Sequence, residues 1–137
     1  MSSPAESAFP EGLPQHLATA AFASREPAWK QGDCVEVVEW LSHNGYAVLG
    51  TELWIVTNGR IRTLMNTKKG RVLYSTYCDP VPEESWDKYV QRCGQLAGES
   101  VSTFRWPEDS LENPNTAYFN LTWADREWFR SRGKFED

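Results

Sequence analysis

The clearest hydrophobic pattern in this chain predicts a long amphipathic helix after the turn at Pro80–Val81–Pro82. Apolar side chains recur there at helical spacing for about five turns. They are Trp86, Tyr89, Val90, Cys93, Leu96, Ala97, Val101 and Phe104. Gly94 and Gly98 lie at one edge of this stripe, where a missing side chain would allow close approach of a strand or a partner.

A second helix is predicted between Asp33, a suitable N-cap, and the pair Asn44–Gly45, which favours a helix end. Its apolar face repeats at i, i+3, i+4 and i+7. The residues of that face are Cys34, Val37, Val38 and Leu41. Three polar residues lie together on the opposite face, and they are Glu36, Glu39 and His43.

Alternating apolar and polar positions predict strands elsewhere. One strand covers residues 46–57, with an interruption at Gly50–Thr51, and Asn58–Gly59 is a strong hairpin signal. Alternation continues over residues 60–65 and 71–78, and a last strand covers residues 117–123.

A short helix from Pro14 to about Phe22 and a terminal helix over residues 124–132 complete the order of elements. This order predicts an α+β fold, in which an antiparallel sheet of about four to five strands is packed by two or three helices. We expect residues 1–12 to form a flexible N-terminal arm and residues 13–137 a single domain, with residues 124–137 as a C-terminal helical extension.

Composition supports a folded protein, since 40% of the 137 residues are hydrophobic and seven are tryptophan. No apolar run reaches the roughly 18 residues of a membrane helix, and no signal-peptide pattern is present, so we expect a cytoplasmic protein without membrane association. Three cysteines are too few for a disulfide framework. Cys34 and Cys93 fall on apolar helical faces, so we expect small buried hydrophobes in a reducing compartment, whereas Cys78 is left open.

The net charge of −5 is distributed unevenly. Acids exceed bases before residue 53 and after residue 78, whereas the segment between them holds only bases, namely Arg60, Arg62, Lys68, Lys69 and Arg71. The acidic total argues against general nucleic-acid binding and suits a basic protein partner. Bases beside Trp54 and Tyr74 leave an accessory nucleic-acid module as the third-ranked alternative.

Residue types and spacing indicate no catalytic set, no metal site and no cofactor. His16 and His43 stand alone, and no zinc-ligand spacing, P-loop or GxSxG motif occurs. The acids near Glu112 fit a solvated loop better than a cation site. Glu52 and Asp79 flank the β region and could form an acid pair in a cleft, which keeps a small-molecule-binding or enzymatic domain as the main alternative.

Four short motifs resemble the immunity protein 40 family of bacterial polymorphic toxin systems. The stretch Val48–Trp54 is similar to that family's "ILGGD" stretch, with Thr51–Glu52 in place of glycine and aspartate. Tyr74–Asp79 matches an aromatic and acidic strand end, and Ser85–Cys93 is similar to the "W..YV.RS" helix. Ala117–Leu121 resembles the final "YF.L" strand, so the likeness spans roughly residues 13–123.

The resemblance implies a small cytoplasmic protein, encoded beside a secreted toxin, that binds and neutralises this toxin without catalytic residues. Acidic surface and spare aromatic side chains would supply steering and anchors. The contact residues that we predict first are Glu52, Trp54, Tyr77 and Asp79. The second choice is the helix face of Glu36, Glu39 and His43. The sequence leaves the toxin's identity and the oligomeric state open.

Overall fold

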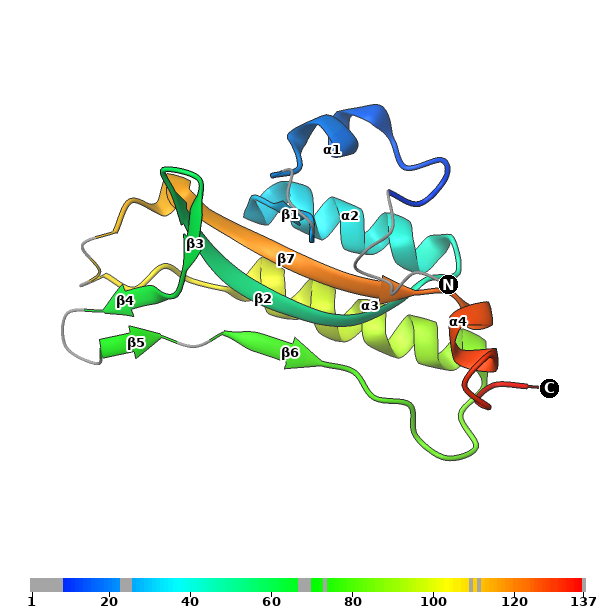
Figure 1. The fold of residues 1–137 in the computed structure, drawn as a ribbon. Coiled ribbons are helices and arrows are strands. Elements are labelled where there is room, and N and C mark those ends of the chain that lie inside the picture. Colours follow the sequence, from blue (N-terminus) through cyan, green and yellow to red (C-terminus); the bar gives the residue numbers. More distant parts are fainter. Residues whose placement is uncertain are drawn as a thin grey trace.

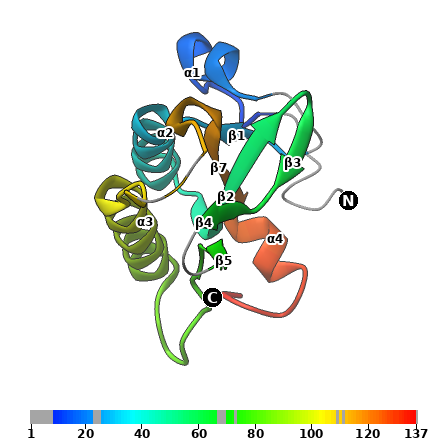
Figure 2. The same cartoon turned by 90° about the vertical axis from the view of Figure 1, so that its left-hand side faces the viewer.

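A five-stranded antiparallel sheet is covered on one face by two long helices in the computed structural model of this chain (Figures 1 and 2). The structure describes residues 9–22, 26–66, 70–72, 74–108, 110 and 112–136. The predicted α+β class, with about four to five antiparallel strands, is confirmed. Of the predicted N-terminal arm, residues 1–8 lie outside the described residues.

The centre of the sheet is the long strand β2 (Ala47–Thr57), which pairs along its length with β7 (Ala117–Ala124). On the other side of β2, β6 (Ser75–Tyr77) pairs with its first half and β3 (Arg60–Arg62) with its second half. The short strand β1 (Ala28–Trp29) pairs with the outer side of β7. Strand β1 was not predicted, because its two residues are too few for a visible alternation.

Two predicted features of β2 have a physical cause in the backbone. Asn58 and Gly59 have φ angles of 52° and 74°, the two positive values that a tight hairpin turn requires. The pairing register shifts between Val48 and Gly50, so the irregularity lies just before the predicted interruption at Gly50–Thr51.

The two strands predicted after this hairpin are each divided in the structure. The chain leaves the main sheet after β3, and β4 (Leu64–Asn66) pairs with β5 (Gly70–Val72) in a separate two-stranded sheet. The chain then returns to the main sheet at β6. The alternation of apolar and polar residues continues across each point of division. The sequence pattern therefore could not show that the strand changes its pairing partner there.

Helices α2 (Gln31–His43) and α3 (Trp86–Thr103) form the covering layer (Figure 2). Helix α2 begins at Gln31 and not at the predicted cap Asp33. The Gln31 side chain donates hydrogen bonds to the carbonyl oxygens of Val101 (2.8 Å) and Phe104 (2.9 Å), which joins the start of α2 to the end of α3.

The predicted apolar stripe of α3 is buried except at Leu96, which is 42% exposed, and at Phe104, which is half-buried and lies one residue beyond the helix end. Gly94 explains how the two helices lie so close, since a Cβ atom there would lie 2.5 Å from the Ser42 Oγ atom of α2. A Cβ atom on Gly98 would lie 3.7 Å from Val38. The two glycines of α3 therefore allow α2 to pack closely against it.

Aromatic residues pack in both clusters of the hydrophobic core. Trp29, from the segment between α1 (Gln15–Ala20) and α2, is fully buried and donates a 2.8 Å hydrogen bond from Nε1 to the Leu17 carbonyl oxygen. At the other end, helix α4 (Arg126–Arg130) and the residues after it place Phe129 and Phe135 against Trp86. The C-terminal extension is thus packed into a core cluster. A short 3₁₀ helix, Pro114–Thr116, precedes β7.

The cysteines differ from the prediction at one position. Cys34 is free and fully buried, as expected, and burial raises the pKa of its thiol. The prediction that Cys93 is a reduced, buried hydrophobic residue is wrong, because Cys93 forms a disulfide with Cys78. The end of β6 meets α3 there with the two Cα atoms 5.5 Å apart, a proximity that a sequence separation of 15 residues does not reveal.

Thiol labelling under three conditions should distinguish these states. We expect no label in the native protein and one, at Cys34, after unfolding without reductant, because the other two cysteines are bonded. Unfolding with reductant should expose all three. Mass spectrometry of the labelled chains measures the count. Labelling of three thiols in unfolded, unreduced protein would contradict the disulfide.

Candidate functional site

Glu52 and Tyr77 are neighbours on the sheet face that points away from α2 and α3. The β2–β6 register pairs Gly50 with Tyr77 and Glu52 with Ser75. Thr51 is buried, so the alternating side chain of Glu52 points to the opposite face, where it is exposed. Two residues separated by one such diagonal lie about 7–8 Å apart, within reach of one partner side chain.

Tyr77 is the most exposed large hydrophobic residue described, at 76% of its full exposure. Its ring lies beside Gly50, since a Cβ atom built on Gly50 would be 3.7 Å from Tyr77 Cδ1. The same Cβ atom would be 2.9 Å from the Thr76 carbonyl oxygen, closer than real contacts allow. Gly50 therefore lets β6 approach β2 and supports an aromatic ring that faces solvent.

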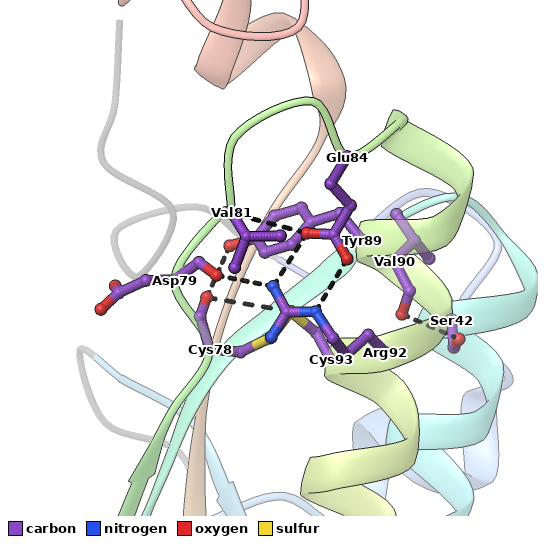
Figure 3. Close-up of a disulfide and its surroundings, with 9 residues drawn as sticks. All are labelled: Ser42, Cys78, Asp79, Val81, Glu84, Tyr89, Val90, Arg92 and Cys93. Atoms are coloured by element: carbon purple, nitrogen blue, oxygen red, sulfur yellow. Dashed lines mark hydrogen bonds and ion pairs between the residues drawn. A yellow bond between two sulfur atoms is a disulfide. The ribbon is translucent and has the colours of Figure 1, made fainter.

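Asp79 follows β6 and is held by its backbone. Its carbonyl oxygen accepts a 2.7 Å hydrogen bond from Arg92 Nη2, while its carboxylate is exposed and points away from Arg92 (Figure 3). Glu52 is also exposed. Both carboxylates are therefore solvated, unlike the buried and paired carboxylates that are typical of strongly perturbed catalytic groups.

Trp54 lies on the same face of β2 but is only 7% exposed. It pairs in register with Tyr118 of β7. A buried indole has little area left for a partner, so Trp54 is a weaker contact candidate than Glu52, Tyr77 and Asp79.

The three residues of the second predicted site are divided by the structure. Glu36 Oε2 lies 2.6 Å from Nε2 of His16 and connects α2 to α1. Glu39 and His43 instead line an open groove of about 530 Å³ between α2 and α3, which Glu99 also borders. This groove lies on the helical layer, on the opposite side of the sheet from Glu52.

Sequence reasoning missed a cluster around Arg92 that holds the segment Asp79–Ser85. Arg92 Nε and Nη2 donate to Oε2 and Oε1 of Glu84 at 2.8 and 2.9 Å (Figure 3). These bonds hold the pKa of Glu84 below its ordinary value of 4.5. Arg92 and Glu84 lie on different elements, so no helical spacing signals their pairing.

The bases of the segment 60–71, which keep an accessory nucleic-acid module as an alternative, are only partly described. Arg62 pairs with the Glu112 carboxylate, which consumes its charge locally. Lys68 and Lys69 lie outside the described residues.

Within the described ranges, no group of three or more His, Cys, Asp or Glu side chains could hold a metal ion. None of the helices in that part of the chain has the length and apolar composition needed to cross a membrane. The described residues do present exposed acidic side chains and the exposed ring of Tyr77 at the β6 edge of the sheet. This edge continues into the segment Asp79–Ser85, which Arg92 holds by hydrogen bonds.

The described residues therefore form a small α+β domain that exposes the acidic and aromatic side chains of Glu52, Tyr77 and Asp79. A family model described as Immunity protein 40 matches residues 17–123, and the chain belongs to this family. Membership confirms the resemblance found in the sequence and implies neutralisation of a toxin. Comparison with curated proteins and with solved structures finds no match.

Replacement of Gly50 by alanine should test the close approach beneath Tyr77. We expect Gly50→Ala to lower the free energy of unfolding by about 1–3 kcal/mol, because the Thr76 carbonyl must move. Gly32→Ala is the matched control, since nothing lies within 4 Å of a Cβ atom there. This control should stabilise by about 0.4–1 kcal/mol through the unfolded chain. Urea unfolding measures both, and an equal effect of the two changes would contradict the tight contact.

Proposed function

We propose that this chain neutralises a cognate toxin by binding it stoichiometrically, without catalysis, through the sheet edge at β6, where Tyr77 and Asp79 lie next to Glu52 of β2. The observation that carries the proposal is the exposure of Tyr77, 76%, on a backbone position kept open by Gly50. Tyrosine is enriched among the residues that dominate binding energy at protein interfaces. A tyrosine ring that is supported on one side and free on the other fits that role.

Charge supports a basic partner. The chain has a net charge of −5, and the carboxylates of Glu52 and Asp79 are both exposed near Tyr77. Opposite charges accelerate encounter and orient the partner before contact. Trp54 is too buried to be a main contact in this proposal, and the groove at Glu39 and His43 is the second candidate surface.

We place this action in the bacterial cytoplasm, as the sequence resemblance implies. Disulfides are rare in that compartment. However, Cys78 and Cys93 are only 4% and 0% exposed, and restricted access slows attack by cellular thiols. The bond is thus compatible with a reducing compartment on kinetic grounds.

Co-expression in bacteria tests the proposed function directly. The probe is the toxin domain encoded by the neighbouring gene, and we expect this chain to restore growth at an equimolar ratio. Tyr77→Asp should abolish rescue, because it removes the anchor, whereas His43→Ala on the helical layer should retain it. Killing that continues while toxin and wild-type chain are both soluble would refute the proposal.

Salt dependence tests the contribution of charge. Association should slow as salt rises, because the screening length falls from about 10 Å at 0.1 M to about 3 Å at 1 M. Glu52→Gln with Asp79→Asn should reproduce part of this slowing, and Glu39→Gln, an exposed acid of the other surface, should not. Tyr77→Ala should act on the off-rate and cost about 2 kcal/mol or more.

Stopped-flow kinetics measures these rates. Unchanged rates in the Glu52, Asp79 and Tyr77 variants, together with slower association in Glu39→Gln, would move the interface to the α2–α3 groove.

A further inference from the structure

The segment Asp79–Ser85, between β6 and α3, is held at both ends although it lies at the surface (Figure 1). At its start, the Cys78–Cys93 disulfide and a 2.6 Å hydrogen bond from Tyr89 Oη to the Cys78 carbonyl oxygen attach the end of β6 to α3. At its end, the Ser85 side chain caps α3 by accepting from the Lys88 backbone N–H.

Arg92 joins the two ends of this segment. Its Nη2 atom donates to the Asp79 carbonyl oxygen at 2.7 Å and to Glu84 Oε1 at 2.9 Å, and its Nε atom donates to Glu84 Oε2 (Figure 3). Glu84 Oε1 also accepts from the Val81 backbone N–H at 3.4 Å. One side chain of α3 thus determines the path of the segment, and Pro80 and Pro82 restrict it further.

The backbone conformation confirms that the segment is constrained. Glu83 has a φ angle of 68°, in the left-handed region that non-glycine residues rarely occupy. Such a conformation persists when surrounding contacts over-determine it, and it is common at binding sites.

The bonds that hold the segment leave its outer side chains available. Val81 is 49% exposed, although it is a hydrophobic residue in a fixed position. The Asp79 carboxylate and the Glu83 side chain are exposed as well. Beside the segment lies a surface hollow that Glu83 and Glu84 line together with Arg126 and Lys134 from the α4 side, so basic groups border the loop at that end.

We propose that Asp79–Ser85 is a preorganised contact loop of the toxin interface, whose shape the Cys78–Cys93 disulfide and Arg92 maintain for binding. This inference rests on the proposed function and extends the contact surface from the sheet edge to the loop. The partner surface has an apolar recess for Val81 and a basic group facing Asp79. A loop fixed before binding loses less conformational entropy in the complex, so fixation slows dissociation.

Surface substitutions test the contact itself against the toxin domain encoded by the neighbouring gene. Val81→Asp should raise the dissociation rate about tenfold or more, because it places a charge in an apolar recess. Leu96→Asp is the matched control, since Leu96 is a similarly exposed aliphatic residue (42%) on α3. This control should bind like the wild type.

Two clamps hold the loop, namely the Arg92–Glu84 ion pair and the Cys78–Cys93 disulfide, and loss of either one tests whether the loop is preorganised. In Glu84→Gln and in the double variant Cys78→Ser/Cys93→Ser, hydrogen exchange of amides in residues 81–85 should accelerate, while amides of β2 and β7 stay protected. The dissociation rate should rise several-fold in both variants, with a smaller change in the association rate. Circular dichroism confirms the fold of each variant.

The outcomes separate the two proposals. Wild-type binding with unchanged dissociation in Val81→Asp would overturn the contact loop and leave the proposed function standing. Faster exchange in the clamp variants without faster dissociation would overturn the role of the clamps. A wild-type chain that does not bind the toxin domain would overturn both proposals.

Discussion

Strand β2 pairs with β7 on one side, from Ala47–Ala124 to Ile55–Ala117, and with β6 and β3 on the other. The rest of the structure depends on this register, because side chains alternate between the two faces of a strand. Leu53 and Ile55 pack beneath the helices, and the intervening positions carry Glu52 and Trp54 to the opposite face. A slip of one residue would bury the Glu52 carboxylate in an apolar core, at a cost that folding could not offset. The same pairing that forms the core therefore also positions the acidic and aromatic face that we propose as the contact surface.

Helix α3 connects the core with the loop that we assign to the interface. Its inward residues Tyr89 and Cys93 are fully buried and hold the end of β6, whereas the neighbouring Arg92 is partly exposed and holds Asp79 and Glu84. Because the helix is itself packed against α2 through Gly94, the loop inherits the rigidity of the core. Recognition on such a surface depends less on ordering the loop at the moment of binding.

Much of this arrangement could be predicted from local patterns. The buried stripe of α3, the Asn58–Gly59 turn and the alternation of β7 each follow from spacing within one segment, and each is present in the structure. Motifs around Gly50 and Trp86 also indicated the immunity protein 40 family, which the family match over residues 17–123 confirms. Of the candidate contact residues, Glu52, Tyr77 and Asp79 are exposed, whereas Trp54 is nearly buried.

The sequence by itself determined which face of each element is apolar, because burial imposes a period of 3.6 residues on a helix and 2 on a strand. It could not determine which distant segments meet. The Cys78–Cys93 bond, the Arg92–Glu84 pair and the contact of Gly94 with Ser42 each join residues on different elements. The division of Glu36 from Glu39 and His43 has the same origin, since Glu36 bonds to His16 of α1 whereas Glu39 and His43 line the groove between α2 and α3. Periodicity records whether a side chain is buried or exposed, and only the packing of the whole chain decides what it touches.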